Sequence, residues 1–349
     1  MGSAISRRRL LQLMALSGAA SLLGCGRAGE AAAPPRLGSV RGQLPRTWLQ
    51  RLPDPWISTS VDTVGALTPD PPAPFDLLAL SDGWALEDAA RRWQPPAAPA
   101  LRARLAPWVS DMAGPALPEV LLERALPVGV SPWVIVHRLP RRSAPPPSEG
   151  WGMLLDPELQ GSLVLPSSPR VVMALAERLP NGLEDLPRLR RQAFSHDERH
   201  ALNLLLAGEV LAAVCQLRWL VPLLRSDHRL QVLLPEQGTV LGWTVLVRPT
   251  GSPEPLPQPW VDAAWEPPLL ARLARGGWLP PLPPGDLRPA LATLPEELAA
   301  WMAPSPALLR RCVSLGPLDP EERQRLQRIW DAAAPPAGLS PRGGAWGRP

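Results

Sequence analysis

The chain has no tyrosine and no lysine, and Asn181 and Asn203 are its only asparagines. Tryptophan, in contrast, occurs 15 times, and every strongly basic side chain is an arginine. This bias is typical of a GC-rich genome and says nothing about function by itself. It does mean that tryptophan and arginine can stand where related proteins carry tyrosine and lysine.

Cysteine is also scarce: the chain has only Cys25, Cys215 and Cys312. Zinc sites and disulfide frameworks usually show clustered cysteines at regular spacing, and the sequence has no such cluster. Cys215 lies in an apolar run, where a buried and unreactive thiol is the usual outcome. A disulfide between Cys215 and Cys312 is possible in an oxidising compartment, although two isolated cysteines offer no spacing that supports it.

The N-terminal segment lacks an apolar run long enough to stay in a membrane. Arginines at 7–9 precede an apolar stretch at 10–23, which is shorter than the roughly 20 residues of a spanning helix. A basic start, a short apolar stretch and small residues before a cleavage site predict a secretory signal. The sequence LLGC at 22–25 resembles a bacterial lipobox, in which Cys25 would be acylated and become the mature N-terminus. The alternative is an ordinary cleaved signal with a chance cysteine.

Both alternatives predict export from a bacterial cell, by the general or the twin-arginine route, because paired arginines also resemble a twin-arginine signal. We therefore expect a periplasmic protein that is anchored to a membrane by a lipidated Cys25. The sequence pI of about 9.9 suggests an anionic partner. However, the net charge falls from +4 to about +1 once the arginines at 7–9 leave with the signal. We expect no nucleic-acid partner, because such binding needs a clustered basic face.

Proline is abundant, with 49 residues, but it alternates with apolar runs and so predicts many short elements. Strands alternate with helices along the chain, an order that favours an α/β architecture with a parallel sheet. The patterns predict strands at 75–80, 130–137, 163–166, 210–214, 230–234 and 240–247. They predict helices at 84–93, 170–179, 195–206, 219–224, 260–273 and 321–334.

Two histidines, His196 and His200, are spaced to share one helix face, which can bind zinc. The metalloprotease pattern needs a glutamate directly after the first histidine, and Asp197 stands there instead. A capping box with Ser195 as the N-cap and Glu198 at the third helical position explains the same residues without a metal. We expect no metal at this helix.

Other catalytic patterns are incomplete. Ser131 lies between turn-forming residues but lacks the second glycine of a nucleophile elbow. Gly276 and Gly277 have the wrong spacing for a phosphate-binding loop. We expect a protein that is not an enzyme and that carries no cofactor.

Several segments, in order, resemble motifs of bacterial polyamine-binding proteins. DLLALSD at 76–82 resembles their DLVVPSD, and WGMLLDPELQGSL at 151–163 resembles their W-x-D-L-x-x-P-E-x-x-G. SSPRVV at 167–172 takes the place of their DDAREV, and AGEV at 207–210 resembles their x-G-E-V. PEQG leading to VRP, at 235–249, resembles their P-x-E-G and x-I-P.

The chain thus resembles the spermidine- and putrescine-type substrate-binding lipoproteins of ABC importers. The resemblance implies an α/β, two-lobed periplasmic-binding-protein (type II) fold, with hinge strands and an interlobe cleft that closes on a small ligand. It also implies an ABC permease in the inner membrane as the partner. The expected organisation is a signal at 1–25, a flexible tether at 26–40, lobe one at 41–138 and 244–290, lobe two at 139–243 and 291–334, and a disordered tail at 335–349.

The sequence departs from these motifs where the family places acids against the ammonium groups of its ligand. Ser168 and Val171 stand at two such positions, Gln216 replaces a strand aromatic, and GWT at 242–244 replaces W-x-D. Only Asp82 remains as an anion. Burying a polycation without counter-charges is costly. A lipoprotein that kept the fold but lost or changed its ligand, and acts in structure or interaction, is therefore the alternative.

The resemblance places the candidate ligand contacts at the ends of strands and at loops. We expect tryptophans to stack on the ligand, hydroxyl and amide side chains to hydrogen-bond it, and the one carboxylate to pair with an amine. The candidate ligand-binding residues are Ser81, Asp82, Trp133, Ser168, Arg170, Gln216, Trp243 and Thr244.

Overall fold

The structure is a computed structural model that describes residues 33–67, 74–86, 89–111, 116–138 and 150–335. The predicted signal and lipobox, with Cys25, lie outside the described residues, as do the tether up to residue 32 and the tail from residue 336. The chain divides into two units, Met1–Pro34 and Pro35–Pro349, and every element below belongs to the second.

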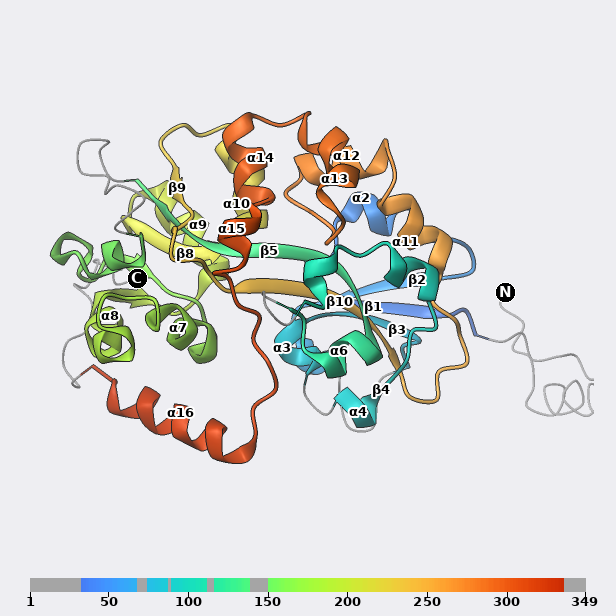
Figure 1. Ribbon diagram of the computed structural model, residues 1–349, viewed down its shortest axis with the longest axis horizontal. Coiled ribbons are helices and arrows are strands. Elements are labelled where there is room, and N and C mark those ends of the chain that lie inside the picture. The colour runs from blue at the N-terminus through green and yellow to red at the C-terminus, as the bar shows by residue number, and fades with distance from the viewer. Residues whose placement is uncertain (1–32, 68–73, 87–88, 112–115, 139–149, 336–349) are drawn as a thin grey trace, which may run out of the picture. The chain divides into compact units, whose positions relative to one another are not determined.

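One sheet of ten strands runs through the described part of the chain, in the order β2-β1-β3-β10-β5-β8-β6-β7 (Figure 1). Two short strands lie off this path: β4 pairs with β10, and β9 pairs with β5. The strands are β1 (Arg36–Val40), β2 (Ile57–Val61), β3 (Leu77–Ser81), β4 (Trp93–Gln94), β5 (Ala125–His137), β6 (Leu163–Val164), β7 (Ala193–Ser195), β8 (Ala212–Gln216), β9 (Gln231–Leu233) and β10 (Leu241–Pro249).

Two long strands join the two halves of this sheet. β5 pairs with β10 through its first part, up to Pro132, and with β8 from Trp133 onward. We call the elements around β1–β4 lobe one and those around β6–β9 lobe two. The prediction of a two-lobed α/β fold is confirmed, with β5 and β10 in the place of the hinge strands.

The expectation of a parallel sheet is wrong for its centre. β1 is parallel to β2 and β3, and β6 is parallel to β7 and β8. β10, however, is antiparallel to β3 and β5, and β5 is antiparallel to β8. The two long strands cross between the lobes in opposite directions, and each is antiparallel to its neighbours in the centre of the sheet.

Helices cover both faces of the sheet in each lobe (Figure 1). In lobe one, α2, α11, α12 and α13 lie on one side, and α3, α4 and α6 lie on the other. In lobe two, α9 and α10 lie opposite α7, α8 and α16. The helices are α2 (Arg46–Leu49), α3 (Asp82–Ala85), α4 (Ala89–Arg92), α5 (Pro99–Ala103), α6 (Glu119–Arg124), α7 (Pro169–Ala176), α8 (Leu186–Gln192), α9 (Glu198–Ala207), α10 (Leu217–Leu224), α11 (Gln258–Ala264), α12 (Leu269–Arg275), α13 (Pro284–Leu291), α14 (Glu296–Met302), α15 (Pro306–Leu309) and α16 (Pro320–Ala332).

Alternating side chains divide the interior into three cores. In β3, Leu77 and Ala79 enter a core that spans both lobes, and Leu78 and Leu80 enter a core confined to lobe one. The third core lies in lobe two, on the same side as the lobe-one core. A core that both lobes share does not mark where one lobe ends and the other begins. The lobe boundaries at 138/139, 243/244 and 290/291 therefore stay a prediction.

The tether predicted at 26–40 is wrong for residues 36–40, which form β1. Leu37 is fully buried, and β1 pairs with strands on both sides. Small residues and glycine in this segment suggested a linker. Gly38 instead lies close under Phe75 and Leu78, where a side chain would collide with them.

Two predicted helices are interrupted. Trp93, expected at the end of a helix, belongs to β4, and its indole donates to the carbonyl of Ala85. The helix expected at 260–273 is split into α11 and α12, because Pro267 and Pro268 cannot continue the first helix.

The capping residue of α9 also differs from the prediction. Asp197, rather than Ser195, is the N-cap, and its carboxylate accepts the N–H of Arg199. Ser195 ends β7. The predicted end of the helix at Gly208 is confirmed, because this glycine adopts the left-handed conformation that favours glycine at a helix end.

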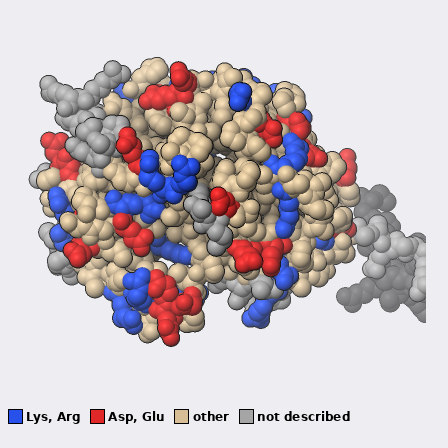
Figure 2. Space-filling model, in the orientation of Figure 1, with Lys and Arg blue, Asp and Glu red and all other residues tan. Residues whose placement is uncertain are grey.

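Both described cysteines, Cys215 and Cys312, are buried and free, so the disulfide between them is not formed. No helix of the described residues is both long and apolar enough to cross a membrane. On the face drawn in Figure 2, basic side chains gather over the region of α15, where Arg310 and Arg311 are exposed. Acidic side chains lie at several places around them.

Candidate ligand-binding site

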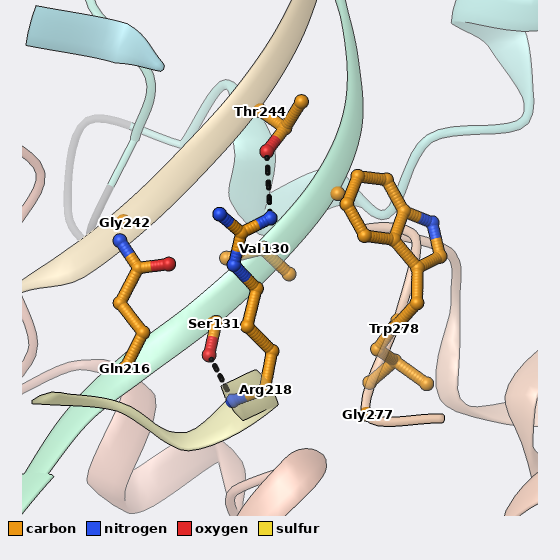
Figure 3. A pocket seen from close by; sticks show the side chains of 10 residues that line it. Val130, Ser131, Gln216, Arg218, Gly242, Thr244, Gly277 and Trp278 are labelled. Carbon is orange, nitrogen blue, oxygen red and sulfur yellow. Dashed lines mark hydrogen bonds between the residues drawn. The ribbon is translucent and has the colours of Figure 1, made fainter. Parts of the chain in front are cut away.

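A narrow pocket opens where the two long strands cross, beside the start of α10 (Figure 3). The empty space around its lining is about 180 Å³, which includes open solvent, and no enclosed part of it is large enough for a water molecule. Both lobes and both crossing strands contribute to it. It is lined by Gly129, Val130, Ser131, Gln216, Arg218, Gly242, Thr244, Gly277, Trp278 and Leu279.

Arg218 is the only charged residue of this lining. It lies in the first turn of α10, where its backbone N–H donates to the Ser131 hydroxyl oxygen at 3.0 Å. Its Nη1 donates to the carbonyl of Gln43 at 3.1 Å and to the Thr244 hydroxyl oxygen at 3.4 Å. In Figure 3 the guanidinium extends toward β10, with Gln216 on one side and Trp278 on the other.

The guanidinium of Arg218 has no acidic partner, since no carboxylate of the described residues lies within 4 Å of it. Burial lowers its pKa to about 10, so it stays protonated at neutral pH. Its Cζ lies 5.4 Å from the ring centroid of Trp219 and 5.8 Å from that of Trp278. These aromatic faces stabilise the cation in part.

Two glycines shape the pocket walls. Gly277 has φ +88°, and a side chain there would collide with the carbonyl of Arg218. At Gly242, a side chain would occupy the place of the Gln216 amide. The close approach of α10 to the segment before Trp278 therefore requires glycine at 277, whereas at 242 the flexible Gln216 side chain could move aside.

Gln216 and Thr244 are predicted ligand-binding residues that do line the pocket. Gln216 ends β8, and Thr244 lies in β10 opposite Ser81 of β3. The Thr244 hydroxyl oxygen accepts a hydrogen bond from the Gln43 amide at 2.7 Å, in addition to that from Arg218.

Ser81, Asp82, Ser168 and Arg170 lie instead at the starts of α3 and α7. Ser81 is the N-cap of α3, and Asp82 is its first residue. The Ser168 hydroxyl caps α7 by accepting the N–H of Val171 at 3.4 Å. None of these side chains lines the pocket at Arg218.

Asp82 and Arg170 interact electrostatically between lobe one and lobe two. Burial of the Asp82 carboxyl raises its pKa to about 6, although backbone N–H groups of Trp243 and Gly83 and the charge of Arg170 act to lower it. Burial also lowers the pKa of Arg170, which Asp82 partly offsets. The one predicted anion therefore already interacts, at longer range than an ion pair, with an arginine of the same chain.

The segment 313–316 runs between α15 and α16 (Figure 1) and contacts both β10 and Arg170 of α7. Its backbone pairs with the residues just before and within β10, through Val313 N–H to Thr239 at 2.9 Å and Leu241 N–H to Val313 at 2.8 Å. The Trp243 indole donates to the Ser314 hydroxyl at 2.8 Å, and Arg170 donates to the carbonyl of Gly316.

The predicted stacking role of Trp133 and Trp243 is not supported by their positions. Their exposed fractions are 5% and 1%, and both belong to hydrophobic cores. Trp133 packs edge-on against Trp219, and Trp243 packs against Trp108 at 5.5 Å. Both rings pack against core residues, because the strands that carry them are buried on both faces.

The sequence did not predict Arg218, Trp278 or Gln43 as functional residues, nor Ser131 as a pocket residue. Arg218 lies two residues after Gln216, at the same strand end, so its position was a usable signal. Trp278 offered none, because its approach to the pocket depends on how the segment after α12 packs against β5.

The zinc arrangement considered for His196 and His200 is absent from the described residues, which contain no group of three metal-ligating side chains. The His196 ring packs edge-on against Trp330, with ring centroids 5.6 Å apart. His200 is exposed and lies 3.7 Å from Asp197.

No protein-family model matches the sequence, and no curated protein matches it significantly. Solved structures do match. The spermidine/putrescine substrate-binding protein PotD of Streptococcus pneumoniae has a TM-score of 0.68 at 12% identity, over 86% of this chain and 98% of that one. The chain has the fold of ABC-transporter substrate-binding proteins.

Two further neighbours share this fold. The TpPotD lipoprotein of Treponema pallidum has a TM-score of 0.63 at 12% identity, over 86% of this chain and 98% of that one. AgtB of A. tumefaciens, solved with agropinic acid, has a TM-score of 0.56 at 14% identity, over 86% and 96%. The resemblance to polyamine-binding proteins noted in the sequence is thus confirmed at the level of the fold.

Proposed function

We propose that this protein is the extracytoplasmic solute-binding component of an ABC importer, which takes up a small solute between its lobes and delivers it to a permease. The observation that carries the proposal is the pocket at the crossing strands. Lobe two supplies Gln216 and Arg218, β10 supplies Thr244, and lobe one supplies Trp278. Closing the lobes would bring these groups together around a solute.

Small-molecule sites usually begin at a volume of roughly 300 Å³. In this conformation the pocket has no enclosed room even for a water molecule, and the empty space of about 180 Å³ around its lining includes open solvent. Solute entry therefore requires the lobes to separate about β5 and β10. The pairing of these strands shifts register between Thr244 and Val245, an irregularity suited to bending.

The motifs and the PotD neighbours favour spermidine or putrescine as the ligand. The local charges favour another solute, because the pocket holds the cation of Arg218, and the charge of Arg170 already acts on Asp82. One neighbour of the same fold was solved with agropinic acid, so this fold is not restricted to polyamines.

A fold-retaining lipoprotein that acts in structure or interaction is the second candidate. The specific observation in its favour is the narrow pocket, together with the 313–316 segment that ties Trp243 and Arg170 in place. In either case we propose a periplasmic location with an anchor at Cys25, and the importer role adds an inner-membrane permease as the partner.

A test is to purify the protein without unfolding it and identify any small molecule that it releases on denaturation by mass spectrometry. The importer role predicts one solute at close to one molecule per protein. Protein that has been unfolded in guanidinium chloride, dialysed and refolded is the matched control, and it should release none but bind the identified solute again. A refolded protein that fails to rebind that solute, or a preparation that releases none, would favour the structural role.

A further inference from the structure

The pocket between the lobes combines one positive charge with neutral groups only. Its lining contains no aspartate or glutamate. Arg218 has no carboxylate within 4 Å among the described residues, and its buried Nε has no hydrogen-bond partner among them. An unpaired charge in a poorly hydrated site is costly, and a bound anion would offset that cost.

The neutral polar groups of the pocket also favour an anion. The Ser131 oxygen accepts from the backbone N–H of Arg218, and the Thr244 oxygen accepts from Gln43 and Arg218. Each hydroxyl thereby keeps its own hydrogen free to donate. The site therefore offers hydroxyl hydrogens and unused guanidinium N–H groups, and it has few acceptors.

We infer that this pocket binds the carboxylate of a small organic acid, held by the Arg218 guanidinium with the hydroxyls of Ser131 and Thr244. This inference rests on the proposed solute-binding function and names the class of its ligand. A planar guanidinium can donate two parallel hydrogen bonds to a carboxylate. One negative charge balances the single cation, whereas a phosphate brings close to two at neutral pH.

The same contacts keep the site narrow. Nη1 of Arg218 joins α10 of lobe two to Gln43 of lobe one and to Thr244 of β10. A carboxylate would take over these donors as the lobes part and close again. A polyamine would instead place ammonium groups beside Arg218, where like charges repel.

The experiment is isothermal titration of the intact mature protein with a fixed panel. The panel contains monocarboxylates and dicarboxylates from acetate to glutarate, the primary amide of each, inorganic phosphate, sulfate, spermidine and putrescine. The protein variants are the wild type, Arg218→Gln, Arg218→Lys and the control Arg225→Gln. Arg225 follows the same helix and is exposed.

At least one carboxylate should bind the wild type, and its amide should bind about a hundredfold more weakly or not at all. Arg218→Gln should lower the affinity by about a hundredfold, and Arg218→Lys by about tenfold, because lysine keeps the charge and loses the planar pair of donors. Arg225→Gln should bind as the wild type does. The comparison of acid with amide uses the wild type alone, so it decides the matter even if an Arg218 variant fails to fold.

The other outcomes overturn the inference in different ways. Binding of spermidine, putrescine or an amide alone would keep the solute-binding function and refute the carboxylate site. Binding of phosphate or sulfate without any carboxylate would refute the assigned ligand class. Binding of nothing in the panel, by a protein that also releases no solute when denatured, would refute both proposals and leave Arg218 as a contact between lobes.

Discussion

Replacing Asp82 by asparagine should stabilise the protein at neutral pH. Asp82 begins α3, is buried, and has an exposed fraction of 8%. Its pKa is raised to about 6 from 3.8, mainly because burial disfavours the charged form. An asparagine keeps an oxygen that can accept the backbone N–H of Trp243 and removes the buried charge.

The size of the effect follows from the pKa. A rise of about two units corresponds to about 3 kcal/mol at roughly 1.4 kcal/mol per unit. Ionised Asp82 thus destabilises the folded protein by this amount above pH 6, and the destabilisation disappears as the pH falls from about 6 toward 3.8. Asp82→Asn should therefore raise the unfolding free energy by about 1 to 3 kcal/mol at pH 7.5, with a gain about a third as large at pH 4.5.

The assay is urea unfolding followed by tryptophan fluorescence, with the wild type and Asp82→Asn measured side by side from pH 4.5 to 8. The difference between the two curves isolates Asp82 from other titrating groups. Asp111→Asn is a control, because Asp111 is exposed. A variant that is less stable than the wild type at pH 7.5, or a difference that does not change with pH, would refute the reasoning.

Two further predictions concern a histidine and a pocket glycine. Burial lowers the pKa of His137 below its usual 6.5. Burial of the neutral ring should therefore leave stability unaffected above pH 6.5, and the unfolding free energy should fall as the pH drops below 6.5, because only the unfolded state then takes up a proton. His137→Leu should remove that loss in thermal unfolding curves, and an unchanged acid dependence would contradict this. Gly277→Ala should lower the unfolding free energy by more than about 1 kcal/mol, because its φ is +88° and the Arg218 carbonyl is in the way. Equal stability of this variant and the wild type in urea would refute the requirement for glycine, and Gly285→Ala, at an open position, should cost less.

Six of the ten strands were predictable from the sequence, because apolar runs such as 75–80 and 240–247 overlap β3 and β10. Their directions were not, since local patterns do not record that β10 runs against both β3 and β5. The same limit made β1 look like a linker: its small residues are buried only because strands pair on both sides.

Two of the ten residues that line the pocket, Gln216 and Thr244, were predicted, through the resemblance to the family motifs. Trp243 is a neighbour of Thr244, yet the alternation of a strand sends its ring into the core of lobe one. Arg218 and Trp278 meet only through tertiary packing, so no local pattern could pair them.

The most direct test of the account is small-angle X-ray scattering of the protein with and without the solute that it binds. We predict a smaller radius of gyration in the loaded protein, because the lobes close about β5 and β10 on that solute. A bound protein whose radius of gyration equals that of the solute-free protein would contradict closure of the lobes, which is the claim on which the proposed transport function depends.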